Sequence, residues 1–147
     1  MKTSLAQLDA DYSPEQVSRA HTTESAWRSI DTEIGLLTAT EVAQRCGSGS
    51  TGRSSYASDA RRGGRLLGVK RLNRYLYPAF QLGPTGPHAV VANLKKAGDL
   101  LEVGEEAILL WMTAPTTWWD GESRPVDHHD DPEGVVAAFT SHYGSTW

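Results

Sequence analysis

The sequence has only one cysteine, Cys46, in 147 residues. A single thiol cannot form an internal disulfide and cannot supply the ligands of a cysteine-rich zinc site. The chain also has no apolar run long enough for a membrane span, and no N-terminal signal with a basic start and an apolar centre. These absences predict a cytoplasmic protein of one domain or two small ones, with 39% hydrophobic residues for a modest core.

Recognisable catalytic chemistry is equally scarce. The Gly- and Ser-rich run at residues 47–52 lacks the preceding strand and the lysine of a phosphate-binding loop. His128 and His129 lie among aspartates, but adjacent histidines on a turn diverge, whereas structural zinc needs four converging ligands. No nucleophile or oxyanion pocket accompanies them. We therefore expect no catalytic residue, no metal site and no cofactor, and a protein that is not an enzyme.

What the sequence does have is an uneven distribution of charge. The net charge of −4 combines −3 over residues 1–45, +6 over residues 46–80 and −7 over residues 81–147. A basic block between two acidic ones is typical of a segment that meets a polyanion, although a merely solvated basic face would have the same composition.

The centre of the basic block is a predicted β-hairpin. Two apolar runs, Leu66–Val69 and Tyr75–Phe80, flank a short basic turn. Such runs around a tight turn are typical of paired strands, and Asn73 tolerates the positive φ that the turn requires. Pro78 cannot donate a ladder hydrogen bond, so the second strand should end there or lie at an edge.

Helices are predicted upstream of this hairpin. Ser13–Gln16 can open a helix whose stripe, including Trp27 and Ile30, forms either core or a dimer face, and Gly35 ends it. Thr38–Glu41 is a second capping box, opening a short helix through Arg45. After a glycine-rich joint, a further helix covers about residues 53–62 and stops at Gly63 and Gly64.

This order predicts a mainly α-helical protein with three parts. They are an N-terminal helical extension (1–35), a helix-turn-helix-like DNA-binding module with a small β-hairpin wing (36–83), and a helical C-terminal domain (84–147). The residues expected to contact DNA are Arg53, Ser54, Tyr56, Arg61, Arg62, Arg65, Lys70, Arg71 and Arg74.

The C-terminal domain is predicted to follow a structureless connector, Leu82–Pro87. A helix opened by Pro87 should end at Gly98, a second should span Glu105–Thr113, and a third should run from about residue 131 to Gly144. Four tryptophans belong to this half: Trp111, which we expect in the core, and Trp118, Trp119 and Trp147. The last three are either part of an aromatic core or anchors of a protein interface.

Three stretches in this order resemble a known family: LLTATEVAQRCG, GRLLGVKRLNRYLYPAFQL and LLWMTAPTTWWDGESRPVDHHDDPEGVVAA. They resemble the Xre/MbcA/ParS-type antitoxins, which are the partners of RES-domain toxins, over about residues 36–144. The more specific part is a helix ending in W-[LM]-x-x-P, followed by a D-G turn and an R-P-[VL]-D step. The chain departs from this pattern at Trp119, where an aliphatic residue is usual, and at His128-His129, where leucine is expected.

The resemblance implies an antitoxin whose C-terminal domain occludes a NAD-consuming RES-domain toxin and whose DNA-binding half represses the shared operon. The partners are then the toxin and operator DNA, in a homo-oligomer or a toxin–antitoxin hetero-oligomer. Trp147 would either enter the toxin's cleft or fold back on its own domain. The alternative is a stand-alone transcriptional regulator whose C-terminal domain oligomerises. The expected toxin contacts are Pro115, Trp118, Trp119, Asp120, Arg124, Pro125 and Trp147.

Overall fold

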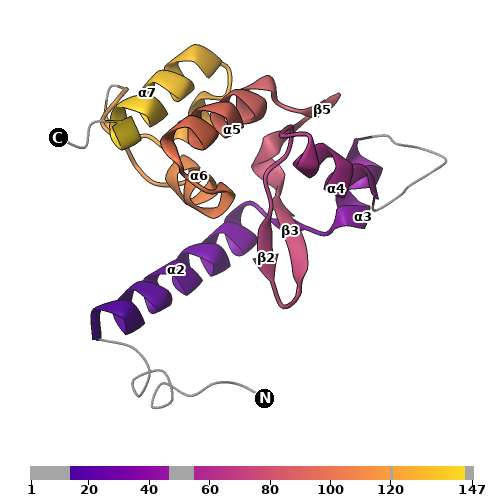
Figure 1. The fold of residues 1–147 in the computed structure, drawn as a ribbon, viewed down its shortest axis with the longest axis horizontal. Helices are drawn as coiled ribbons and strands as arrows, with labels where there is room; N and C mark the ends of the chain where they lie inside the picture. Colours follow the sequence, from indigo (N-terminus) through magenta and orange to yellow (C-terminus); the bar gives the residue numbers. More distant parts are fainter. Residues whose placement is uncertain (1–13, 47–54, 120, 145–147) are drawn as a thin grey trace.

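The computed structural model describes residues 14–46, 55–119 and 121–144, with side chains from residue 23 onward. This part of the chain is mainly helical, with a small antiparallel sheet (Figure 1). The predicted fold class is therefore confirmed. The α-helices are α2 (Pro14–Glu33), α3 (Ala39–Arg45), α4 (Ser55–Arg62), α5 (Ala89–Leu101), α6 (Glu105–Met112) and α7 (Pro132–Gly144). The described residues also include the short 3-10 helices η2 (Ala79–Gln81) and η3 (Pro125–His128).

The sheet is built around the predicted hairpin. Strands β2 (Val69–Arg71) and β3 (Arg74–Pro78) pair antiparallel, and β3 ends at its proline as expected. A strand that the sequence did not indicate, β1 (Leu36–Leu37), pairs with the other edge of β3, so the order is β1-β3-β2. The hairpin is thus held on the body by β1 while its turn projects away from α5, α6 and α7 (Figure 1).

Local signals account for most helix ends. The Thr38 side chain accepts from the Glu41 amide, and the Glu41 carboxylate accepts from the Thr38 amide, which forms the predicted capping box of α3. Gly35 and Gly64, at φ 109° and 77°, adopt the left-handed region where α2 and α4 have ended. Glycine suits both positions because it has no Cβ to clash there.

Among the residues whose side chains are described, the buried apolar ones form two clusters. The smaller joins α3 and α4 to β1 and β3, and includes Val42, Ala57 and Tyr77. The larger joins α5, α6 and α7, and takes in Trp27 of α2 and Val69 of β2. One core therefore draws on all three predicted parts of the chain, and the boundaries at residues 36 and 84 stay predictions.

Two predictions in the C-terminal half were wrong. The connector is not structureless, because β4 (Leu82–Gly83) and β5 (Gly86–Pro87) pair as a second small hairpin. Gly98 does not end its helix, which continues to Leu101 and is closed by Glu102 at φ 58°. Gly98 is buried instead, since a Cβ there would lie 2.7 Å from Ile108 Cδ1 and 2.9 Å from the Val103 carbonyl oxygen. It permits α5 and α6 to approach closely.

A buried polar residue fixes the base of the wing. Gln81 is 1% exposed, and its side-chain oxygen accepts from the Leu67 amide at 2.8 Å. Its amide nitrogen donates to the Leu67 carbonyl at 2.7 Å and to the Pro78 carbonyl at 3.3 Å. The segment before β2 is thereby hydrogen-bonded to the segment after β3.

Across the described ranges, none of the helices combines the length and the apolar character needed to cross a bilayer.

Candidate nucleic-acid interface

The wing ends in a tight turn made of Leu72 and Asn73. Their φ angles are 51° and 65°, and the flanking residues Arg71 and Arg74 are paired across the strands. Two consecutive left-handed residues between paired strands are the mark of a type I′ hairpin turn. Asn73 adopts the positive φ that the sequence predicted. Leu72 is 94% exposed at the tip.

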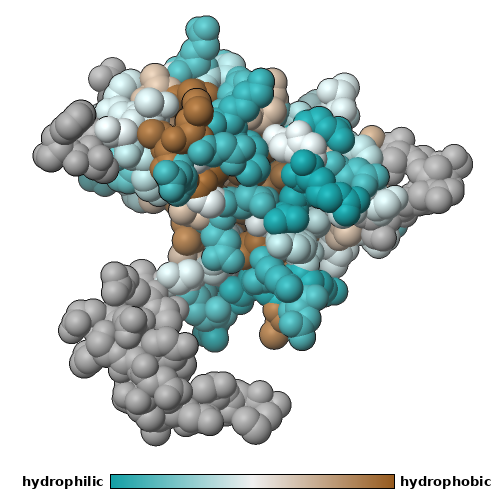
Figure 2. Space-filling view, viewed as in Figure 1, coloured by the Kyte–Doolittle hydropathy of each residue, from teal (hydrophilic) through white to brown (hydrophobic). Residues whose placement is uncertain are grey.

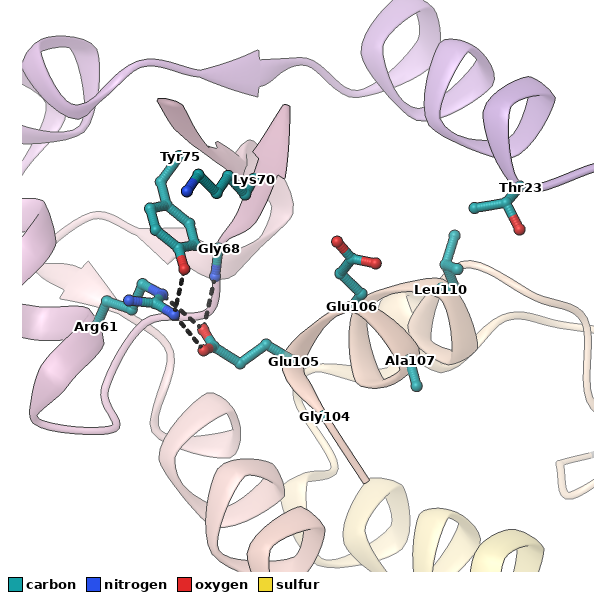
Figure 3. Close-up of a pocket in the computed structure, with 10 residues that line it drawn as sticks. All are labelled: Thr23, Arg61, Gly68, Lys70, Tyr75, Gly104, Glu105, Glu106, Ala107 and Leu110. Carbon is teal, nitrogen blue, oxygen red and sulfur yellow. Dashed lines mark hydrogen bonds and ion pairs between the residues drawn. The ribbon is translucent and has the colours of Figure 1, made fainter. Parts of the chain in front are cut away.

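A polar junction joins α4, the wing and α6 (Figure 3). The Arg61 guanidinium donates to both carboxylate oxygens of Glu105, at 3.1 and 2.9 Å, and its carbon lies 3.8 Å from the centre of the Tyr75 ring. The Gly68 amide donates to the same carboxylate at 3.0 Å. Because both partners are largely buried, this ion pair fixes the wing relative to the C-terminal helices rather than leaving Arg61 free.

The junction borders an open cleft of about 560 Å³ between the wing and α6. Lys70 and Tyr75 line it from the wing, and Glu106 and Leu110 line it from α6 (Figure 3). Both signs of charge face this cleft. It therefore lacks the single-signed field of a polyanion site, and the candidate interface lies on the outer surface of α4 and the wing.

A second ion pair ties the wing to the N-terminal helix. Arg71 donates to the two carboxylate oxygens of Glu24 at 3.1 and 2.7 Å. The hydrogen bond from Arg71 lowers the pKa of Glu24, and the same bond raises the pKa of Arg71. Arg28 adds a weaker contact to Glu24 at 3.5 Å. One face of the wing is therefore neutralised by α2.

These contacts change the set of predicted DNA-binding residues. Arg61 and Arg71 were expected to contact DNA, and both are engaged by carboxylates within the chain, which leaves them less available to phosphates. Tyr56 is half-buried against the smaller cluster, and burial raises the pKa of its hydroxyl; its contact with DNA stays a prediction. Arg53 and Ser54 lie outside the described residues.

Four predicted cations remain exposed. Arg62 lies in the last turn of α4 and pairs with Asp59 of the same helix, with both side chains largely in solvent. Arg65, Lys70 and Arg74 are exposed, and no other described residue forms an ion pair with them. The end of α4 and the wing thus carry exposed cations suited to phosphate contacts, with Lys70 and Arg74 on opposite faces of the hairpin.

The predicted partner-binding loop divides into exposed and structural residues. Pro115 is exposed and Trp118 is 47% exposed. Trp119 is half-buried: its ring stacks on His128 at 3.9 Å between centroids, and its Nε1 donates to Asp131 at 3.4 Å. Trp111 is buried in the larger cluster, as predicted.

Two other predicted toxin contacts are held within the chain. Pro125 is fully buried, so it supports the loop rather than touching a partner. Arg124 pairs with Glu33 of α2 at 2.9 Å, and that hydrogen bond raises the pKa of Arg124. It is therefore engaged within the chain. Asp120 and Trp147 lie outside the described residues.

Sequence reasoning missed the acidic partners Glu24, Glu33 and Glu105. Each is an ordinary helix-surface glutamate by its local pattern, and only long-range pairing distinguishes it. It also missed Leu72, although a leucine inside a run of basic and turn residues is itself unusual.

Around His128 and His129, as elsewhere in the described ranges, no three potential ligands converge on a metal position.

The class that the fold defines is a mainly helical protein with a small antiparallel hairpin held between its helices. No protein-family model matches the chain, and no curated protein matches its sequence. Among solved structures, the NMR structure of Rv2175c is similar, with a TM-score of 0.64 and 18% sequence identity. The likeness covers 76% of this chain and 82% of that chain, and at this identity it concerns the fold alone.

Proposed function

We propose that this protein binds duplex DNA through the end of α4 and the β2–β3 wing. The observation that carries the proposal is the cluster of exposed cations there, Arg62, Arg65, Lys70 and Arg74, in a chain whose net charge is −4. Cations gathered on a projecting hairpin and the adjoining helix end can contact phosphates on both sides of a groove. The flanking acidic segments then keep the rest of the surface away from the polyanion.

The test is a titration of a fluorescent duplex with the full chain at several salt concentrations. Lys70→Ala with Arg74→Ala should weaken binding and flatten the plot of log affinity against log salt by about one unit per lost phosphate contact. The matched control compares Lys70→Ala with Lys96→Ala, because each removes one positive charge and exposed Lys96 lines the groove between α5 and α7. Equal effects of these two single variants would contradict the proposed interface.

We further propose that the C-terminal helices bind a protein, and that the chain acts as an antitoxin toward a RES-domain toxin and represses its own operon. The resemblance stated above supplies the partner class. Exposed Trp118 supports it, because exposed aromatic residues are common interface anchors, and so does exposed Pro115, which lines a hollow of about 370 Å³ between α6 and α7. Tyr143 of α7 lines the same hollow.

Co-expression with a RES-domain protein from the neighbouring reading frame, followed by size exclusion, tests this partner. Trp118→Ala should weaken the complex by about 2 kcal/mol, whereas Leu100→Ala, at another exposed apolar position, should leave it unchanged. A wild-type chain that elutes alone and does not restore NAD levels in the co-expressing cells would contradict the antitoxin assignment.

A second candidate is a transcriptional regulator whose C-terminal domain only oligomerises. The observation favouring it is Leu100, 86% exposed, in a shallow groove with Val136 and Ala137 of α7. Figure 2 shows hydrophobic atoms gathered over this part of α5 and α7. Light scattering separates the two: on this second assignment, Leu100→Glu should convert a dimer to a monomer without any toxin present.

A further inference from the structure

The residue at the tip of the wing is unsuited to its position by local physical chemistry. Leu72 adopts φ 51°, in the left-handed region that is unfavourable for a residue with a Cβ, and type I′ turns strongly prefer Asn, Asp or Gly there. Its side chain is also 94% exposed and packs on nothing within the described chain. Folding alone would favour asparagine at this position. A strained, exposed apolar residue therefore points to a role outside the folded chain.

The neighbours of Leu72 indicate the kind of surface it meets. Lys70, Asn73 and Arg74 are all exposed around it. Figure 2 shows hydrophobic atoms at the end of the hairpin, bordered by hydrophilic ones. An apolar tip with cations on both strands is suited to bind a polyanion that also has a narrow apolar site for one side chain. The stacked bases of a duplex, reached between two phosphate backbones, have this combination.

We propose that Leu72 is an apolar wedge that the wing inserts into the minor groove of duplex DNA, partly unstacking one base step and bending the helix. This inference rests on the DNA binding proposed above and adds how the wing acts. Lys70 and Arg74 contact the phosphates on either side, and Leu72 enters between them. Steps that unstack easily, such as TA, are the favoured sites, so the wedge contributes sequence preference without a hydrogen bond to a base.

The geometry of the hairpin favours DNA over a lipid surface. The tip lies two residues along the strand from the level of the Lys70–Tyr75 pair, or about 7 Å from the Arg61–Tyr75 contact, so the turn and the end of α4 lie close enough to contact one duplex. A membrane would receive a single leucine and two cations from the same turn. Stable anchoring at a bilayer takes considerably more apolar area or a second signal.

The experiment uses the full chain and a short duplex with a central TA step carrying 2-aminopurine, together with a duplex labelled at both ends for energy transfer. Leu72→Asn removes the wedge and gives the turn a residue that it prefers. We expect this variant to melt about 3 °C higher, to bind about tenfold more weakly, and to lose both the bend and the 2-aminopurine signal, with an unchanged salt slope. A gain in stability with a loss of function separates the wedge from a merely structural role.

Two matched variants complete the design. Leu72→Met keeps an apolar tip and should retain the bend, and Asn73→Gly improves the turn while leaving Leu72 in place and should also retain it. If the wild type binds DNA but Leu72→Asn binds with the same affinity and bend, the wedge is overturned and the proposed interface stands. If the wild type fails to bind DNA, both are overturned. Binding only to vesicles containing phosphatidylserine, lost in Leu72→Asn, would assign the tip to a membrane instead.

Discussion

Replacing Gln81 by methionine should be among the most damaging single changes in this chain. Its side chain is 1% exposed and bonds both the amide and the carbonyl of Leu67, which is itself buried. Methionine has a similar length but offers neither group a partner. Each orphaned buried backbone group costs about 1–3 kcal/mol, and the transfer of an apolar side chain offsets part of that sum. We therefore expect a loss of about 3 kcal/mol of unfolding free energy.

Urea denaturation followed by circular dichroism measures this loss, with the slope against urea concentration expected to stay constant. The corresponding fall in melting temperature is roughly 10 °C for a chain of this size. Gln44→Met is the matched control, because Gln44 is exposed on α3 and should change stability by less than about 0.5 kcal/mol. A loss below about 1 kcal/mol for Gln81→Met would refute the argument that this side chain holds the base of the wing.

Three further predictions concern stability. Gly98→Ala should destabilise the fold by about 2 kcal/mol despite the better helix propensity of alanine, because the added Cβ would clash with Ile108 of α6 and with a backbone oxygen. Thermal melting measures this loss, and a stabilised variant would contradict the packing argument. Burial lowers the pKa of His88 below its ordinary value of 6.5, so the unfolded chain binds this proton more readily and stability should fall as the pH drops below 6.5. His88→Asn should flatten that dependence in denaturation series from neutral to mildly acid pH. Trp111→Ala should lower the free energy of unfolding by about 3–5 kcal/mol, whereas Trp118→Ala should leave the melting temperature nearly unchanged. Equal losses of stability would show that Trp118 also packs in the core.

Features that depend on neighbours in sequence were predictable. The capping box of Thr38 and Glu41 forms as its spacing indicated, because both hydrogen bonds join residues three apart. Asn73 takes the left-handed conformation, and Trp111 is buried within an apolar helix. In each case the deciding interactions are local, or follow from the periodicity of one element.

Features that depend on distant partners were not predictable. Arg61 and Arg71 look alike in the sequence as members of a basic block, yet carboxylates 44 and 47 residues away engage them. Gly98 has the local signature of a helix end, but the packing of Ile108 decides its role. Nothing near Gln81 in sequence marks it as buried. A single sequence shows which charges are present, and the tertiary fold determines which of them remain available.

Helix α2 has a practical consequence for work with shortened forms of the protein. It carries Glu24 and Glu33, which engage Arg71 and Arg124, and it covers part of the core with Trp27. A fragment trimmed to the region of the resemblance would release both guanidinium groups while exposing apolar surface. Such a fragment would bind any polyanion more tightly than the intact chain does, for reasons unrelated to operator recognition. Affinity and selectivity measured on it would describe a more cationic and less selective molecule.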